Sequence, residues 1–323
     1  MLYPVKLQAP LKDYLWGGTR LREEYGKASD MEKVAESWEL SCHKDGESLI
    51  AEGEDRGLTL AAYIEREGRQ ILGPRCAGQE EFPILIKFID ARDSLSVQVH
   101  PDNEYAERVE GEQGKTEMWY VLDAEPGAKL IYGFEKEISK EEFRERIEED
   151  TLLEVCRQVP VKKGDVFFIE AGTLHAIGAG ILICEVQQSS NSTYRVYDYG
   201  RIGADGKSRP LHIGKALAVT KRKPQLLNTK PLAEIDLLKG CRLSLLAKCD
   251  YFTTYHIKLS DWNVVQFGAP DESFQSLTML SGNLTLNCGG EELLLEKGET
   301  VFLPVGMGEY SLQGEAECLL VEK

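Results

Sequence analysis

The sequence is poor in positive charge and has no long hydrophobic run. Of its 323 residues, 38 are Lys or Arg and 54 are Asp or Glu, which gives a formal net charge of -16 at pH 7. Sequence-indifferent nucleic-acid binders and polybasic membrane-surface proteins both depend on an excess of basic residues. No apolar run approaches the ~18 residues that cross a bilayer. We therefore expect no nucleic-acid or membrane partner, while a small anionic substrate stays open because local cations can override a global field.

The sequence also has no pair of cysteines spaced C-x-x-C and no segment resembling a secretory signal. Its eight cysteines are scattered, and several of them, such as Cys184 and Cys318, lie within apolar runs. In a chain of this length such cysteines are typical of small buried hydrophobes and not of a disulfide framework. Residues 1–18 contain no continuous apolar stretch after a basic segment. We expect a cytoplasmic protein.

Short β-rich runs dominate the chain, whose length suggests about two domains. The clearest expected strands are residues 83–89, 94–100, 117–122, 165–170 and 181–187. Helices are expected in fewer places: from Thr59 to Gly68, from Pro101 to near Gly111, over 139–157 and over 212–219. For the third of these, Ser139 and Glu142 form a capping box. This pattern favours barrels or sandwiches of short strands.

An internal repeat supports two similar β units. Residues 163–175 read KGDVFFIEAGTLH and residues 297–309 read KGETVFLPVGMGE, with Lys, Gly, Phe and Gly at equivalent positions. The first copy ends on His175 and the second on Glu309, so one unit has kept a ligand histidine. Residues 220–232 have the composition of a connector. We expect a catalytic metal-binding domain over 1–235 and a β domain without metal ligands over 236–323.

Histidine is scarce, with five residues, yet two of the five lie where strands end at turns. Gln98 and His100 are two residues apart on one expected strand and therefore project from the same face. Glu117 opens another strand, and His175 follows the turn at Gly172. Two histidines and one carboxylate from different strands predict a divalent-metal site, with positions left for Gln98, water or substrate.

The other three histidines and several cations are more ambiguous. His212 and His256 are expected to be structural, and His43 to be solvated or near a cleft rim. Arg195 and Arg201 lie in the polar segment 189–201, which is either an exposed strand or the wall of a pocket that grips an oxyanion or phosphate. Lys87 lies within an apolar strand, where burying its charge costs free energy unless the ammonium reaches a pocket or a partner. Lys115, which follows a glycine, can point to the same mouth.

Four segments together, QVHPDNEYA, GKTEMWYVL, GTLHAIGAG and NSTYRVYDYGR, closely resemble the type I phosphomannose isomerase family in its short bacterial form. The resemblance extends over nearly the whole chain, from LWGG to RPLHIGKAL. It implies the cupin superfamily, and so a mainly β protein of two cupin-type β-barrel or jelly-roll domains with a few short helices on the catalytic barrel. It also implies a zinc-dependent isomerase that interconverts mannose 6-phosphate and fructose 6-phosphate through a cis-enediol.

The resemblance also assigns roles to residues. His100, Glu117 and His175 would bind one Zn2+ per chain, with Gln98 a fourth ligand found in parts of the family. Arg195 matches the active-site arginine. The other positions that match the pocket are Trp16, Lys87, Ser96, Lys115, Glu185 and Arg201. For the general base, the hypothesis is Glu185 or metal-bound water. Glu170 departs from the family, which usually has Pro there, and we expect a local change in the turn without loss of metal.

Two other functions fit parts of the pattern. A cupin-type oxygenase also uses two histidines and a carboxylate to bind iron, but the cluster of cations suits a sugar phosphate. The second alternative is a non-catalytic sugar-phosphate-binding or regulatory paralogue, although the intact ligand set and Arg195 argue against it. The sequence leaves open whether the protein is a monomer or a homodimer.

Overall fold

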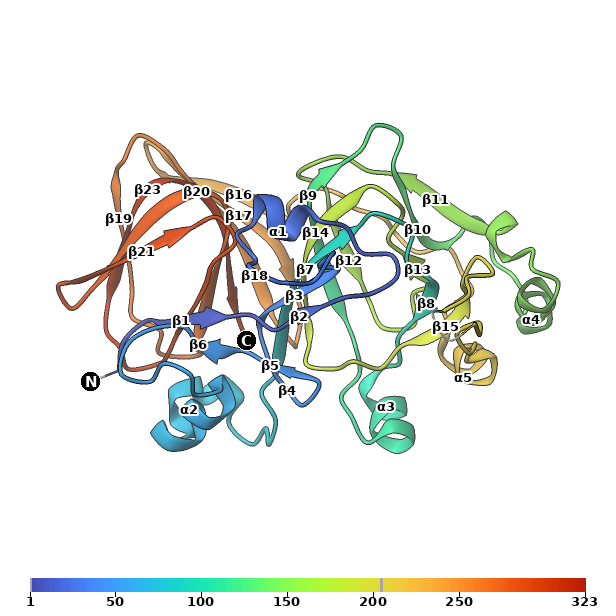
Figure 1. Cartoon of the computed structure of the whole chain (residues 1–323), viewed down its shortest axis with the longest axis horizontal. Helices are drawn as coiled ribbons and strands as arrows, with labels where there is room; N and C mark the ends of the chain where they lie inside the picture. Colours follow the sequence, from blue (N-terminus) through green and yellow to red (C-terminus); the bar gives the residue numbers. More distant parts are fainter. Residues whose placement is uncertain (1, 204–205) are drawn as a thin grey trace.

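Strands make up most of the computed structural model, which describes residues 2–203 and 206–323. Figure 1 shows two β lobes side by side, with the C-terminal strands in one and the strands of the middle of the chain in the other. All five strands expected from the sequence are present, although β8 (Val97–Val99) is shorter than predicted. The prediction of a mainly β protein with few short helices is confirmed.

The first lobe consists of two facing sheets. A six-stranded sheet has the order β12-β9-β14-β7-β3-β2, and a five-stranded sheet has the order β11-β10-β13-β8-β15. The strands of the six-stranded sheet are β2 (Leu11–Lys12), β3 (Glu36–Leu40), β7 (Ile84–Ala91), β9 (Glu117–Ala124), β12 (Val166–Ile169) and β14 (Ile181–Gln188). Those of the five-stranded sheet are β8, β10 (Lys129–Phe134), β11 (Cys156–Pro160), β13 (His175–Ala176) and β15 (Tyr194–Tyr197). A small hairpin, β4 (Cys42–His43) with β5 (Gly46–Glu47), lies beside them.

The second lobe is built on one ten-stranded sheet that draws strands from both ends of the chain. Its C-terminal strands are β16 (Ala233–Leu238), β17 (Cys241–Lys248), β18 (Thr253–Leu259), β19 (Val264–Phe267), β20 (Gln275–Cys288), β21 (Glu291–Glu296), β22 (Thr300–Leu303) and β23 (Tyr310–Glu322). Two strands from the N-terminal region complete it: β1 (Val5–Gln8) pairs with β22, and β6 (Leu49–Ile50) pairs with β1. The division of the chain at residue 235 stays a prediction.

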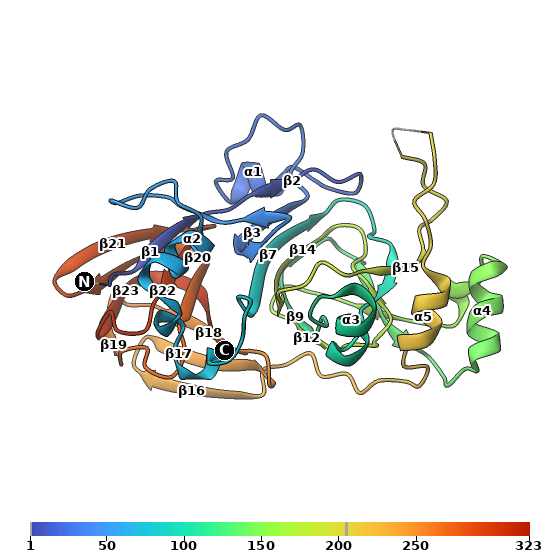
Figure 2. The ribbon, with the colours of Figure 1, turned by 90° about the horizontal axis from the view of Figure 1, so that it is seen from below.

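Helices are short and lie outside the sheets. The structure has α1 (Arg20–Glu24), α2 (Leu60–Glu67), α3 (Asn103–Glu110), α4 (Lys140–Glu148) and α5 (Ile213–Val219), with 3-10 turns at Arg69–Leu72, Pro74–Cys76 and Leu152–Glu154. Figure 2 shows α4 and α5 together at the outer end of the first lobe, where they share a core with the outward face of the five-stranded sheet.

The helix predicted over 139–157 is too long. Its start is right, because the Ser139 hydroxyl accepts a hydrogen bond from the backbone N–H of Glu142. The helix ends at Glu148 because Asp150 adopts a left-handed conformation with φ of 60°, which a continuing helix does not tolerate. The following residues form a 3-10 turn and then enter β11.

The internal repeat has a structural counterpart. Gly164 precedes β12 and Gly298 precedes β22, and both adopt positive φ, 86° and 89°. At Gly298 a Cβ atom would lie 2.2 Å from the backbone oxygen of Tyr25, so both conformation and space require glycine. The same turn therefore opens an equivalent strand in each lobe.

Strict alternation along β7 and β14 separates two buried environments. Ile86 and Phe88 of β7 and Cys184 of β14 face the core shared with the second lobe. Their neighbours Lys87 and Glu185 face the other way, toward the space between the two sheets of the first lobe, because successive strand residues point to opposite faces. Every residue of both strands is buried, and charged side chains therefore reach the interior of the first lobe.

A polar contact joins the two lobes beside this core. The ring of Tyr120 on β9 stacks on His256 of β18, with ring centroids 5.2 Å apart. His256 Nε2 lies 3.3 Å from Glu317 Oε2, and Lys258 Nζ lies 3.2 Å from the other oxygen of that carboxylate. The prediction that His256 is structural agrees with this placement.

Two further observations concern compartment and partners. All eight cysteines are free, and six are buried. Within the described residues, no helix has the length and apolar character needed to span a membrane.

Candidate metal centre and active site

The inward face of the five-stranded sheet carries one row of polar side chains. Gln98 of β8 is paired on one side with His175 of β13 and on the other with Arg195 of β15. Residues directly opposite each other in neighbouring strands point to the same face. Ser96 and His100 flank Gln98 at spacings of two and continue this row along the chain. The pattern predicted for Gln98 and His100 is therefore present.

A second row faces it from the six-stranded sheet. Glu185 of β14 is paired with Lys87 of β7 on one side and with Trp119 of β9 on the other. Two residues before Trp119 on the same face, Glu117 opens β9. The two rows bring together charged residues that are far apart in the sequence.

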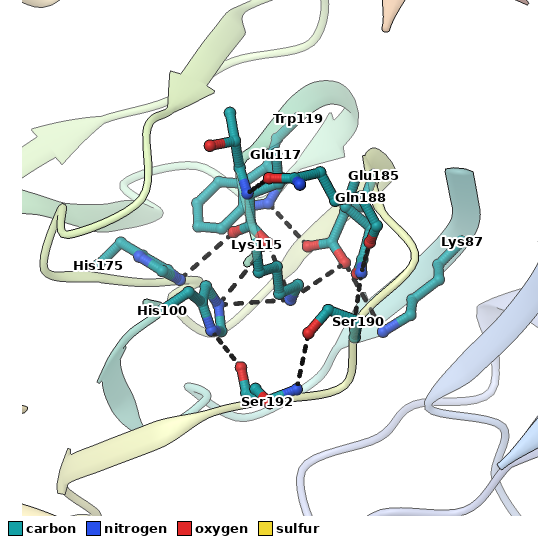
Figure 3. Close-up of polar contacts among 12 residues, drawn as sticks. Lys87, His100, Lys115, Glu117, Trp119, His175, Glu185, Gln188, Ser190 and Ser192 are labelled. Carbon is teal, nitrogen blue, oxygen red and sulfur yellow. Dashed lines mark hydrogen bonds and ion pairs between the residues drawn. The ribbon is translucent and has the colours of Figure 1, made fainter. Parts of the chain in front are cut away.

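Three of these side chains form a compact group of potential metal ligands (Figure 3). The ligand atoms of His100, Glu117 and His175 all lie within 4.8 Å of one another. Glu117 Oε1 is 3.3 Å from His175 Nε2, and Glu117 Oε2 is 3.7 Å from His100 Nε2. All three residues are almost completely buried.

The backbone fixes which nitrogen of each histidine faces Glu117. His100 Nδ1 lies 2.8 Å from the carbonyl oxygen of Ser192, and His175 Nδ1 lies 2.8 Å from that of Thr173. Each Nδ1 must carry a proton to bond with a carbonyl, so each Nε2 presents a lone pair that can bind a metal ion. Metal-binding histidines usually donate their other ring N–H to a carbonyl or carboxylate in this way, which fixes the orientation of the ring. The Nε2 of His175 has no hydrogen-bond partner among the described residues, and that of His100 lies 3.3 Å from Lys115 Nζ.

The protonation states suit a metal ion as well. Burial lowers the pKa of both imidazoles, that of His175 to about 4 and that of His100 well below its ordinary value. Both are therefore neutral near pH 7, which is the form that binds metal. Burial, with a contribution from Glu185, raises the pKa of Glu117 to about 7. The neighbouring lysines therefore do not fully offset the cost of burying the charged carboxylate.

Buried polar atoms without a hydrogen-bond partner also favour a metal site. His175 Nε2 and Glu117 Oε1 are buried and have no hydrogen-bond partner among the described residues. Leaving such groups unpaired costs about 1–3 kcal/mol each. A cation bound between them would satisfy both, so the residues present fit a divalent metal with nitrogen and oxygen ligands.

Two lysines and a second carboxylate adjoin this group. Lys115 Nζ lies 2.8 Å from Glu117 Oε2 and 3.8 Å from Glu185 Oε1, and Lys87 Nζ lies 3.8 Å from the same Glu185 oxygen. Glu185 Oε2 accepts a hydrogen bond from Trp119 Nε1 at 2.8 Å. Burial disfavours the charged form of Glu185, but Lys115 and Lys87 outweigh it and keep its pKa below the ordinary value. Glu185 is therefore a carboxylate at neutral pH.

A cavity of about 240 Å³ opens above these residues. Seven of the residues predicted from the sequence line it: Trp16, Lys87, Ser96, Gln98, Lys115, Glu185 and Arg195. His100, Glu117 and His175 do not line it, but Lys115, which does, contacts both Glu117 and His100. A larger cavity, of about 520 Å³, lies between α2 and the β4–β5 hairpin. His43 lines its edge and is buried, not solvated, but this cavity contains none of the predicted site residues.

Among the predicted substrate-binding residues, Arg201 alone does not line the active-site cavity. Its guanidinium pairs with Asp198 and donates a hydrogen bond to the carbonyl oxygen of Ser94 at 2.6 Å. Arg209 lines the cavity instead. Sequence reasoning overlooked Arg209 because it lies in a loop without β or helical periodicity, although RPLHIGKAL was noted as part of the family resemblance.

Glu36 and Asn191 are further cavity residues that sequence reasoning did not identify. Glu36 accepts a hydrogen bond from Trp38 Nε1 at 2.7 Å, and its Oε2 lies 3.6 Å from Lys87 Nζ. Glu36 lies outside every segment that carries the family resemblance, so no signal in the sequence distinguishes it. In the turn at Glu170, the backbone N–H of Thr173 donates a hydrogen bond to the carbonyl oxygen of Glu170 at 3.0 Å, and the carboxylate pairs with Lys221. The expected change relative to the family stays a prediction.

Comparison with known proteins agrees with this arrangement. Residues 5–128 match the model of the phosphomannose isomerase type I catalytic domain, and residues 243–322 match that of the mannose-6-phosphate isomerase cupin domain. The mannose-6-phosphate isomerase of Streptococcus mutans is 39% identical over 99% of this chain and 98% of its own. The mannose-6-phosphate isomerase ManA of Bacillus subtilis is 35% identical over 98% of each chain. A crystal structure of the mannose 6-phosphate isomerase from Bacillus subtilis superposes with a TM-score of 0.90 at 32% identity and covers 98% of this chain and 99% of that one. On this full-length similarity, the chain belongs to the type I phosphomannose isomerase family.

Proposed function

We propose that the protein interconverts mannose 6-phosphate and fructose 6-phosphate. The observation that carries this proposal is the buried group of His100, Glu117 and His175, which contacts Lys115 in the wall of a cavity lined with lysine and arginine. The full-length relatives from Streptococcus mutans and Bacillus subtilis bear the name of this activity. A dianionic sugar phosphate is the class of substrate that such a cationic cavity would select.

The metal ion in this proposal is one Zn2+ per chain. His100, Glu117 and His175 would hold it, with Gln98 beside them in the same row of the sheet. Zinc accepts histidine nitrogen and carboxylate oxygen and keeps a position open in catalytic sites. When bound, it would supply Lewis-acid polarisation of the sugar oxygens.

Glu185 is the proposed general base. Isomerisation moves a proton between C1 and C2 of the sugar through a cis-enediol, so one group must accept the proton and return it. Glu185 is ionised, lies at the cavity, and is held in one orientation by Trp119 Nε1. Lys87 and Lys115 lie 3.8 Å from the free Glu185 oxygen and would stabilise negative charge that develops on the substrate.

Arg195 would contribute a fixed positive charge on the opposite wall. Its Nε donates a hydrogen bond to Ser96 Oγ at 3.2 Å, and its Nη1 to the carbonyl oxygen of Pro210 at 3.3 Å. A guanidinium held in this way needs little reorganisation to stabilise an enediolate or to bind a phosphate. Trp16 on the same cavity would pack against the sugar. The part that Arg201 plays in substrate binding stays a prediction.

A coupled assay tests this function directly. The purified protein is assayed for conversion of mannose 6-phosphate before chelation, after chelation, and after restoration with zinc. We expect activity that chelation removes and zinc restores. Activity that chelation does not change would contradict the metal site. Absence of conversion by zinc-replete protein would favour a sugar-phosphate-binding paralogue, and turnover that requires iron and oxygen would favour an oxygenase.

A cytoplasmic location also belongs to the proposal. The free state of all eight cysteines, most of them buried, supports a reducing compartment. Whether the protein acts as a monomer or a homodimer stays open.

A further inference from the structure

Asp198 holds two arginines at the edge of the active-site cavity. It accepts hydrogen bonds from Arg209 Nε at 2.8 Å and Arg209 Nη2 at 2.5 Å. The same carboxylate accepts from Arg201 Nε at 3.1 Å and pairs with Arg201 Nη2. The carboxylate is buried, with 7% of the Asp198 residue exposed. We call these three residues the arginine clamp.

The clamp is connected to Arg195 on the cavity wall. Arg195 Nη1 donates to the carbonyl oxygen of Pro210, the residue that follows Arg209. On the other side, Arg201 Nη1 donates to the carbonyl oxygen of Ser94, close in sequence to Ser96, which accepts from Arg195 Nε. Arg209 and Arg195 both line the cavity, whereas Arg201 and Asp198 do not.

The charge of this group suits a phosphate. Arg201 and Arg209 pair with the Asp198 carboxylate, and Arg195 is near enough to interact with the charges of all three. Three guanidinium groups and one carboxylate leave two net positive charges for a substrate group that is close to a dianion near neutral pH. Asp198 uses Nε and Nη2 of Arg209, so Nη1 takes no part in the clamp. Two bonds to one carboxylate fix the plane of the guanidinium, and a pre-oriented guanidinium loses little rotamer freedom when it binds an anion.

We infer that Arg209 determines specificity for the phosphorylated sugar by binding its phosphate, and that Asp198 is the positioning residue that holds Arg209 for this contact. The inference rests on the proposed function, because it concerns the phosphate of that substrate. Arg201, which does not line the cavity, binds the same carboxylate.

Binding titrations with three probes test this inference. Fructose 6-phosphate, fructose and inorganic phosphate are titrated into zinc-loaded wild type, Arg209→Ala and Asp198→Asn, and KM and kcat are measured for mannose 6-phosphate. Because hydrogen bonds between charged groups are the strong ones, we expect Arg209→Ala to weaken fructose 6-phosphate binding about 10–100-fold. Inorganic phosphate should weaken in parallel, fructose should bind as in wild type, and KM should rise much more than kcat falls. Arg92→Ala is the matched control, because Arg92 is exposed and pairs only with its neighbour Asp93 among the described residues.

A double-mutant cycle separates positioning from general damage. If Asp198 acts through Arg209, Asp198→Asn should weaken phosphate binding in the wild-type background and add little once Arg209 is alanine. Asp198→Glu should recover part of the lost affinity, and Arg209→Lys should lie between wild type and Arg209→Ala. Equal loss of fructose and fructose 6-phosphate binding, or fully additive effects of the two substitutions, would overturn the inference.

The outcomes distinguish this inference from the proposed function. If the wild-type protein binds fructose 6-phosphate in a manner that depends on Arg209 but does not convert it, the isomerase proposal fails and the clamp stands. If the wild type converts mannose 6-phosphate and Arg209→Ala retains the wild-type KM, the clamp fails and the isomerase proposal stands.

Discussion

Gln98 and His175 are direct antiparallel partners, one on β8 and the other on β13. Their side chains lie on the same inward face, and His175 Nε2 is 3.3 Å from Glu117. Gln98 is therefore placed beside the proposed metal, whereas His100, Glu117 and His175 enclose it. We therefore expect the two histidines and Glu117 to be required for metal binding, and Gln98 only to adjust the affinity for the metal.

Loss of a histidine should abolish tight metal binding, and loss of Gln98 should only weaken it. We expect His175→Ala to lower zinc affinity by more than the ~10–100-fold typical of second-shell changes, and Gln98→Ala to fall within that range. Competition titration with a chromophoric chelator measures both, and elemental analysis should give one zinc per wild-type chain. The control is His256→Ala, which removes a histidine outside the group. Equal zinc affinity of wild type and His175→Ala would contradict the assignment.

Replacing Glu185 by glutamine should stop proton transfer without displacing the side chain. The amide oxygen can still accept the hydrogen bond from Trp119 Nε1, but the amide cannot act as a base. We expect kcat to fall roughly 100–10,000-fold. The decisive measurement is exchange of the C2 proton of the substrate with deuterated solvent, followed by NMR. Exchange at the wild-type rate in Glu185→Gln would make the assignment wrong.

Removing Lys115 should destabilise the metal-free protein. Its ammonium is the closest cation to the buried Glu117 carboxylate, at 2.8 Å, and deleting one partner of a buried pair costs about 3 kcal/mol or more. We expect Lys115→Met to lower the free energy of urea unfolding of the chelated protein by about this amount, and by less after zinc is added. Lys44→Met is the control, because Lys44 pairs with Glu112 on the surface. Equal effects of the two substitutions would contradict the prediction.

Acid should weaken the contacts of Glu317 with His256 and Lys258, which lie beside the stacking of Tyr120 on His256 between the lobes. The hydrogen bond with His256 and, after it, the contact with Lys258 lower the pKa of this carboxyl to about 2, against an ordinary value of 4.5, although burial acts in the opposite direction. A carboxyl with a lowered pKa stabilises the folded state above its unfolded pKa and loses that contribution as pH falls. The stability difference between wild type and Glu317→Gln should therefore shrink between about pH 4.5 and pH 2. Unfolding free energies across this range measure it, and the exposed Glu315→Gln should show no such trend.

Substrate capture should depend on salt and on Arg201. Because the net charge of -16 opposes a dianionic substrate, moderate salt should assist capture until it competes at the phosphate site. Arg201→Ala should raise KM, roughly tenfold at most, and lower kcat less, because Arg201 pairs with Asp198 and does not line the cavity. Steady-state kinetics at several salt concentrations test both statements. A larger effect on kcat than on KM would assign Arg201 to the transition state.

The sequence predicts local features of the fold well and long-range pairings poorly. The capped helices α2 and α3 end at the glycines expected, Gly68 and Gly111, because capping depends on a few adjacent residues. The addition of β1 and β6 to the second lobe was not anticipated. No local pattern distinguishes the partner of an edge strand when that partner lies at the other end of the chain.

The residues of the candidate site also fall into those that a local sequence pattern predicts and those that only the folded chain reveals. Lys87 was identified because a lysine inside an apolar strand needs a partner, and the structure provides Glu185 and Glu36. Arg209 and Asn191 were overlooked because both lie in loops, where neither period 2 nor period 3.6 indicates which way a side chain points. Asp198 was overlooked because its role depends on two arginines that only the folded chain brings to it.

The pairing of β1 with β22 has a consequence for synthesis. Val5 and Phe302 are partners, although they are about 300 positions apart. At a translation rate of roughly 5–20 residues per second, β1 leaves the ribosome some 15–60 s before the strand that completes its hydrogen bonds. During that interval β1 is an unpaired edge that other nascent chains can engage. The nascent protein is therefore most exposed to misassembly at its first strand, and a chaperone that binds extended segments would protect it there.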